Sequence, residues 1–134
     1  MDDEVRVPVA SDLDIVVARA EGRRLALELG FSNTEATLMA TAISEVARNI
    51  LTYAREGLVT ISTMNTGDVV EILVVASDEG PGIPDVDLAL RDGYSTIGSL
   101  GLGLPGARRL VDEFSIESEA GKGTEVVMKK WRRV

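Results

Sequence analysis

The sequence predicts an α+β domain, a two-layer α/β sandwich with helices on one face of a mixed, mostly antiparallel sheet. Three observations lead to this prediction. Alternating or continuous apolar runs indicate five strands, and apolar residues at helical spacing indicate three helices. Their order is one strand, two helices, two strands, one helix and two strands, with neither a repeat nor a second unit. We therefore expect residues 1–134 to form a single domain.

The first half of the chain predicts a strand and two helices. Alternating valines over residues 4–9 are typical of a half-buried strand. Each helix that follows begins with a sequence that resembles a capping box and ends before a glycine: Ser11 with Asp14 and then Gly30, and Ser32 with Glu35 and then Gly57.

The second half predicts a hairpin, a long loop, a helix and a second hairpin. The elements are expected at these positions: strands 58–63 and 69–77 joined by a turn at 65–68, a helix over 104–113, and strands 114–118 and 124–131. The strand at 69–77 is apolar almost throughout, which predicts a central strand covered on both faces. The segment 78–106 is rich in Gly, Pro, Ser and Asp, with one short helical candidate at 85–92, and is typical of a binding loop or lid.

The composition excludes several classes of function. The chain has no cysteine and no histidine, which rules out zinc fingers, thiol nucleophiles and histidine-based triads. A net charge of −8 argues against a nucleic-acid partner, because such a partner needs clustered cationic surface. No apolar run is long enough for a membrane span, and the acidic start is unlike a signal peptide. We expect no membrane partner and a cytoplasmic location.

Glu45 and Asn49 form the first candidate site. They are four residues apart in the second predicted helix, so both polar groups lie on one side of it. The apolar residues of the same helix lie on another side, where they pack: Met39, Ile43, Val46 and Ile50. Taken alone, the pair is more typical of a solvated helix face than of a ligand site.

The first of three glycine clusters, Asp78–Gly82, directly follows the apolar strand. A carboxylate at a strand end accepts hydrogen bonds as the exocyclic amine of adenine requires, and the glycines allow a base to approach the backbone. A strand-ending turn has the same composition and is the alternative.

The second cluster, Gly98–Gly106, precedes a predicted helix start, where free backbone amides suit a polyphosphate; the alternative is a flexible connector. A dinucleotide fingerprint and a Walker loop both fail, because no βαβ unit surrounds the run and no Gly-Lys-Ser/Thr closes it. The third cluster, Gly121–Thr124, is by itself typical of a hairpin turn. Next to Asp78, its hydroxyl would join a polar network around adenine.

Four motifs in this order resemble the N, G1, G2 and G3 boxes of the Bergerat-fold ATPase and kinase superfamily, which includes gyrase, histidine kinases, MutL and the anti-sigma-factor kinases: Glu45-x-x-x-Asn49, Asp78-x-Gly80-x-Gly82, Gly101-x-Gly103 and Gly121-x-Gly123-Thr124. The resemblance covers nearly the whole chain. The segments Glu45–Ile50, Asp92–Thr96 and Gly101–Gly106 are most similar to the RsbT-like switch kinases of the bacterial stressosome.

This resemblance implies a role for each motif. ATP would bind with its adenine at Asp78 and Thr124, Asn49 would ligate Mg²⁺, and Glu45 would be the general base. The nucleotide-binding residues implied are Asn49, Asp78, Gly80, Gly82, Gly98, Gly101, Leu102, Gly103, Gly106, Gly123 and Thr124, with an ATP lid over about 83–103. Four cations are open candidates for balancing phosphate charge: Arg91, Arg108, Arg109 and Lys122.

The resemblance also implies an activity. A histidine kinase needs a phosphoacceptor histidine, which this chain lacks, and the 83–97 segment is shorter than the lids of topoisomerase or mismatch-repair ATPases. A protein serine/threonine kinase remains, acting on a STAS-domain antagonist or scaffold protein and activating a phosphatase once released. Two alternatives stay open: an anti-sigma factor kinase that also binds a sigma factor, and a non-catalytic nucleotide-sensing interaction module.

Overall fold

The computed structural model describes residues 3–83, Val86, Leu90 and residues 103–134. The elements run along the chain as β1 (Glu4–Val9), α1 (Asp12–Glu28), α2 (Asn33–Ala54), β2 (Gly57–Asn65), β3 (Val69–Asp78), α4 (Gly103–Leu110), β4 (Glu113–Glu119) and β5 (Gly123–Arg133). Of the lid expected over 83–103, the described part contains only Ile83, Val86, Leu90 and Gly103. The helical candidate at 85–92 therefore lies almost entirely outside the described residues.

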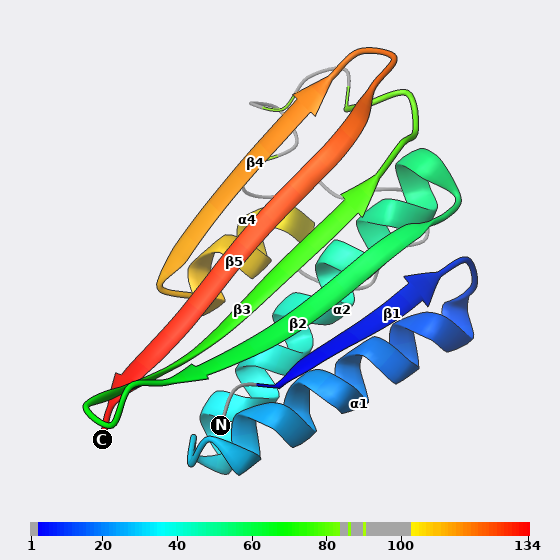
Figure 1. The fold of residues 1–134 in the computed structure, drawn as a ribbon. Helices are drawn as coiled ribbons and strands as arrows, with labels where there is room; N and C mark the ends of the chain where they lie inside the picture. The colour runs from blue at the N-terminus through cyan, green and yellow to red at the C-terminus, as the bar shows by residue number, and fades with distance from the viewer. Residues whose placement is uncertain (1–2, 84–85, 87–89, 91–102) are drawn as a thin grey trace.

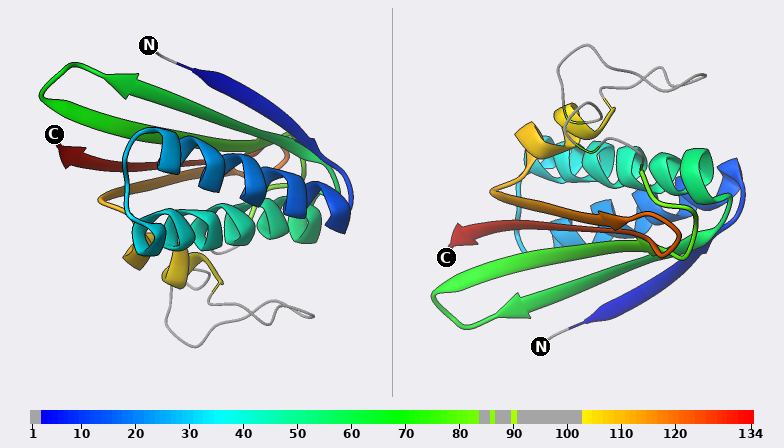
Figure 2. Two further views of the ribbon diagram at one scale, coloured as in Figure 1. Left: turned by 90° about the horizontal axis from the view of Figure 1, so that it is seen from below. Right: turned by 90° about the horizontal axis from the view of Figure 1, so that it is seen from above.

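The five strands form one sheet in the order β1-β2-β3-β5-β4 (Figure 1). All four pairings in it are antiparallel. Figure 2 shows the helices together on one face, with α2 between α1 and α4. The predicted α+β two-layer sandwich is confirmed, but the described strands form an antiparallel sheet and not a mixed one. None of the helices in the described ranges is apolar and long enough to cross a membrane.

The core lies between the helix layer and the inner face of the sheet. Ile61, Ile72 and Met128 project into it from β2, β3 and β5 and are completely buried. Burial alternates along β3, however, so that Leu73 and Val75 are only partly covered on the outer face. The prediction that β3 is central is confirmed, but the prediction that it is covered on both faces is wrong, because all the described helices pack on one side.

The two helix starts differ. At α2 the Ser32 Oγ accepts a hydrogen bond from the Glu35 amide (3.1 Å), and the Glu35 carboxylate accepts one from the Ser32 amide (3.2 Å), which confirms the capping box. At α1 the Ser11 side chain makes no cap hydrogen bond to the backbone. The box predicted there is wrong, because the Asp14 carboxylate accepts instead from the Ala10 amide, at 2.8 Å.

Of the two glycines predicted to end the helices, one does so and the other does not. Gly30 follows the end of α1 with a φ of 88°, as predicted. Helix α2 ends at Ala54, before Gly57, with Arg55 in the left-handed region at a φ of 69°. Gly57 starts β2 instead, where a Cβ would lie 2.5 Å from the Ser77 carbonyl oxygen. This glycine is needed for close packing of two strands.

Helix α4 packs against α2 and is shorter than predicted. It ends at Leu110, since the Asp112 amide already donates to the Lys129 carbonyl oxygen (2.9 Å) and Glu113 pairs with Lys129 in the sheet. The short connection places β4 next to β5 and holds α4 against α2.

We predict that Ser32→Ala lowers the free energy of unfolding by about 0.5–2 kcal/mol, because it leaves the Glu35 amide in the first turn of α2 without its side-chain acceptor. Ser11→Ala is the matched control and should change stability by less than about 0.5 kcal/mol, since the Ser11 Oγ makes no cap bond and donates only a long, exposed hydrogen bond to the Asp14 carboxylate, at 3.3 Å. Urea unfolding of both variants checks this. Equal losses would show that the capping box does not stabilise α2.

Candidate functional site

Asp78 lies at the end of β3, where the sheet meets the first glycine cluster. Its Oδ1 accepts hydrogen bonds from the amides of Gly80 (3.0 Å) and Thr124 (3.2 Å). Asp78 and Thr124 are also direct partners in the β3–β5 ladder. Within the described ranges, the second oxygen, Oδ2, has no hydrogen-bond partner. One oxygen is therefore held by the backbone, and the other can accept from an amino group of a ligand.

Thr124 belongs to a second set of hydrogen bonds next to Asp78. Its side chain is 4% exposed, and its Oγ1 lies 2.8 Å from the Ser118 Oγ. The Ser118 Oγ also accepts from the Ile83 amide at 2.7 Å, which ties the end of the first glycine cluster to β4. The Thr124 amide thus contacts the Asp78 carboxylate directly. The Thr124 hydroxyl is linked through the Ser118 Oγ to the Ile83 amide, next to the first glycine cluster.

Ser118 was missed by sequence analysis. The signal that finds it is its cross-strand pairing with Thr124, and that pairing follows from the β4–β5 register. A serine in a polar edge strand has no feature of its own that separates it from its neighbours.

Three glycines allow the backbone segments around Asp78 to approach one another. Gly123 has a φ of 109°, and a Cβ there would overlap the Asp78 carbonyl oxygen. A Cβ on Gly82 would lie 2.6 Å from the Glu119 carbonyl oxygen, and one on Gly80 would lie 2.5 Å from the Ala54 Cβ. Because these residues have no side chain, backbone atoms lie directly next to the hydrogen bonds around Asp78. A hollow of about 440 Å³ opens beside it, with Asp78 and Thr124 in its wall.

Glu45 and Asn49 do not lie on a solvated face. They are 5% and 8% exposed, in the part of α2 that the rest of the fold covers. The Glu45 Oε2 accepts a hydrogen bond of 2.9 Å from the Gly103 amide, 58 residues further along the chain, at the first residue of α4. Gly103 has a φ of 68°, a conformation that favours glycine. Glu45 of α2 and Gly103 of the second glycine cluster therefore meet, as a shared site requires.

Arg48 is the second residue that sequence analysis missed. Its Nη1 lies 3.2 Å from the Glu45 Oε1, three residues away on the same helix. The spacing of a glutamate and an arginine at i and i+3 is a recognisable signal for such a pair. Among the predicted cations, Lys122 pairs with Glu119 at 3.4 Å on the surface, and Arg91 lies outside the described residues.

Helix α2 connects the two ends of this region. Its last residue, Ala54, is packed against Gly80, next to Asp78, and Asn49 lies between Ala54 and Glu45 along the helix. Glu45 and Ala54 are nine residues apart, or about 14 Å at the rise of an α-helix. A ligand that reaches from Asp78 to Glu45 would be elongated, with an amino group at one end and the reacting group at the other.

Other predicted residues are placed less completely. Gly106 is buried within α4, and Gly98, Gly101 and Leu102 lie outside the described residues. Asn49 offers one amide oxygen, which suits Mg²⁺, since that ion usually takes one or two protein oxygens and keeps water and phosphate ligands. In the described ranges no group of three or more acidic side chains is arranged to hold a metal by itself.

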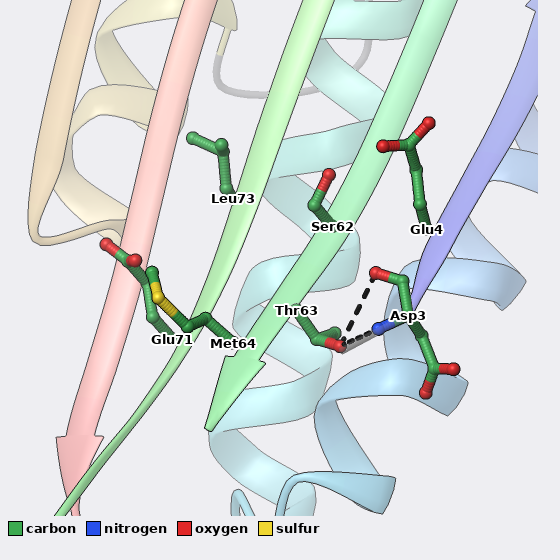
Figure 3. Close-up of a pocket in the computed structure, with 7 residues that line it drawn as sticks. All are labelled: Asp3, Glu4, Ser62, Thr63, Met64, Glu71 and Leu73. Carbon is green, nitrogen blue, oxygen red and sulfur yellow. Dashed lines mark hydrogen bonds between the residues drawn. The ribbon is translucent and has the colours of Figure 1, made fainter. Parts of the chain in front are cut away.

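A second hollow, of about 420 Å³, lies on the outer face of the sheet (Figure 3). Three of the side chains that line it are acidic: Asp3, Glu4 and Glu71. None of the described residues of the four motifs lines this hollow, which disfavours it as the nucleotide site. The inner region around Asp78 and Glu45 is therefore the candidate site.

Comparison with known proteins identifies relatives of this chain. Residues 34–133 match the family described as histidine kinase-, DNA gyrase B- and HSP90-like ATPases. The chain is 47% identical to the serine/threonine-protein kinase RsbT of Bacillus subtilis (strain 168), over 99% of this chain and 100% of that protein. It is 35% identical to the anti-sigma F factor of Geobacillus kaustophilus (strain HTA426), over 72% of this chain and 69% of that protein.

Solved structures share the fold. The RsbU and RsbW domains of Rv1364c from Mycobacterium tuberculosis match 99% of this chain with a TM-score of 0.62 and 21% identity, and the match covers 32% of that longer chain. The mycobacterial sensor histidine kinase MprB matches over the full length of both chains, with a TM-score of 0.52 and 14% identity.

We predict that Gly123→Ala lowers stability much more than Gly121→Ala. Both glycines have positive φ, so an alanine costs about 1–2 kcal/mol at either position. Only at Gly123 does the new Cβ overlap the Asp78 carbonyl oxygen, whereas Gly121 faces open space. Urea unfolding of the two variants measures the difference. Similar losses would mean that the approach of β5 to Asp78 is not tight.

Proposed function

The chain belongs to the family of histidine kinase-, DNA gyrase B- and HSP90-like ATPases, and on this premise we propose that it is an ATP-dependent kinase that phosphorylates a Ser or Thr of a STAS-domain antagonist or scaffold protein. The 47% identity to a serine/threonine-protein kinase, over 99% of this chain, supports the enzyme class. The observation that carries the proposal is the buried Glu45 carboxylate, which accepts a hydrogen bond from the Gly103 amide, within the glycine cluster expected to bind the phosphates.

Glu45 is the general base of this proposal. A carboxylate offers about four acceptor positions, and the contacts with Gly103 and Arg48 use two of them, so a position remains for the acceptor hydroxyl. Glu45 would orient this hydroxyl and take its proton while the oxygen bonds to the γ-phosphorus and the bond to the ADP oxygen breaks. Positioning and charge neutralisation supply most of the catalysis in such transfers.

The other residues bind and orient. Asp78, with Oδ2 open, would accept from the adenine amino group, and the buried Thr124 would support Asp78 through its amide. Asn49 would hold Mg²⁺, which when bound neutralises phosphate charge. The glycines before and within α4 would line the phosphates with backbone amides, since a helix start suits anions.

We also propose that the protein works in the cytoplasm as a partner-switching regulator. Its relatives include a serine/threonine-protein kinase and several anti-sigma F factors, which supports a regulatory role with protein partners. In this scheme the STAS-domain protein is both substrate and docking partner. Release from it would free the kinase to activate a phosphatase in a stress or sigma-factor pathway.

A second candidate function is an anti-sigma factor kinase that also sequesters a sigma factor. Identities of 32–35% to anti-sigma F factors over about 70% of the chain favour it. A pulldown with purified sigma factors of the same bacterium separates the two functions. Retention of a sigma factor in the presence of ATP would support the anti-sigma factor kinase. If no sigma factor is retained, the result supports the kinase that acts only on the STAS-domain protein.

We predict that Glu45→Gln lowers phosphoryl transfer by roughly 10²- to 10⁴-fold, because the amide cannot take the hydroxyl proton. Nucleotide affinity should stay within about threefold. The measurement is ³²P transfer from ATP to a purified STAS-domain partner, together with nucleotide titration. Glu113→Gln is the matched control, since it makes the same change on an exposed glutamate that forms an ion pair with Lys129 at the surface.

Two outcomes would contradict this prediction. Transfer by Glu45→Gln at the wild-type rate would remove Glu45 as the base. If wild type transfers no phosphate while both proteins bind ATP normally, the chain is a nucleotide-sensing interaction module.

We predict that Asp78→Asn weakens nucleotide binding by about 10- to 100-fold. With the amide oxygen facing Gly80 and Thr124, the NH₂ group would replace Oδ2 and meet the adenine amine donor to donor. Asn49→Ala should instead reduce the gain in nucleotide affinity on adding Mg²⁺. Titrations with Mg²⁺ and with EDTA separate the two effects, and unchanged affinities for both variants would overturn the site assignment.

A further inference from the structure

Arg48 is the cation that faces the buried Glu45 carboxylate. Its guanidinium Nη1 lies 3.2 Å from Oε1, and the exposed fractions of the two side chains are 36% and 5%. In the described part of the chain, Glu45 has no other ion-pair partner. A buried carboxylate without a partner is strongly unfavourable, so this arginine balances the charge of Glu45 in the folded protein.

The two oxygens of Glu45 are held from different directions. Oε1 receives Arg48 from the same helix, and Oε2 receives the Gly103 amide from the start of α4. Two donors on two oxygens restrict rotation of the carboxylate about its last side-chain bond. The orientation of the group is therefore determined by the structure before a substrate arrives.

Two other cations of the described ranges, Arg19 and Lys122, do not contact Glu45. Arg19 of α1 lines the groove of about 440 Å³ in which Glu45 and Arg48 lie, but no hydrogen bond or ion pair joins it to Glu45. Lys122 lies with Glu119 at the far end, in the β4–β5 turn. Arg48 contacts Glu45 at 3.2 Å, and its planar group can hold one carboxylate oxygen in a defined direction.

We propose that Arg48 is a positioning residue for phosphoryl transfer: it holds the Glu45 carboxylate in the orientation that accepts the hydroxyl proton, without contacting substrate itself. The inference rests on the proposed function, because it assumes that Glu45 is the base. It assigns a role in the reaction to a residue at an unspecified position of the first motif, between Glu45 and Asn49.

The test compares Arg48→Gln with wild type in single-turnover ³²P transfer to a STAS-domain partner at saturating ATP. The expected rate is about 10- to 100-fold lower, with nucleotide affinity within about threefold. Arg48→Lys should lie between the two, because lysine keeps the charge but not the planar fork. Arg24→Gln is the matched control: Arg24 is paired with Glu21 and Glu28 on the surface of α1, and its loss should leave the rate unchanged.

A double-mutant cycle with Glu45→Gln distinguishes positioning from an independent role. If Arg48 acts through Glu45, Arg48→Gln should cause no further loss of transfer in the Glu45→Gln background. Hydrogen exchange of the Gly103 amide gives a second readout. It should be about tenfold faster in Arg48→Gln than in wild type, since the acceptor of that amide is no longer held.

Three results would overturn the proposal: unchanged transfer by Arg48→Gln, an equal further loss in the Glu45→Gln background, or a loss explained by weaker nucleotide binding. Should Arg48→Gln fail to fold in urea titration, Arg48→Lys takes its place in the cycle, with an expected loss of about threefold to tenfold, and an unchanged rate there also overturns it. Failure of the proposed function is distinct, because either wild type would then transfer no phosphate or Glu45→Gln would transfer at the wild-type rate.

Discussion

The pairing of β3 with β5 is the constraint on which the rest of the site depends. The two central strands are in register from Val69 with Arg133 to Asp78 with Thr124, so the ladder ends at the candidate nucleotide site. Gly123 lets the two backbones meet where a side chain would not fit. A shift of one residue would turn Asp78 toward the other face and separate it from the Thr124 amide, because side chains alternate along a strand.

Helix α2 gives the site its second end. An α-helix is rigid over a few turns, so the separation of Glu45 from the packed end at Ala54 is set by the backbone. The helix is buried on several sides, by the sheet, by α1 and by α4. Burial of this kind explains why polar side chains in the middle of the helix need partners from the protein, and Glu45 has two of them.

Local patterns predicted most of the fold. The Ser32 capping box and the turn before β3 were predicted because all their contacts lie within a few residues. The errors concern contacts between elements: the role of Gly57 depends on the neighbouring strand, and the exposure of Val75 depends on which face the helices cover. An apolar run indicates a strand, but does not say how many layers surround it.

The sequence by itself determined the order of the elements, the fold class and the placement of Glu45 and Asn49 on one side of a helix, because helix and strand periodicity are local properties. Only the tertiary structure decided that the Glu45 carboxylate meets the Gly103 amide and that Ser118 joins Thr124. These contacts depend on how α4 packs on α2 and on the register of β4 with β5. Both result from packing of segments distant along the chain, which no local pattern specifies.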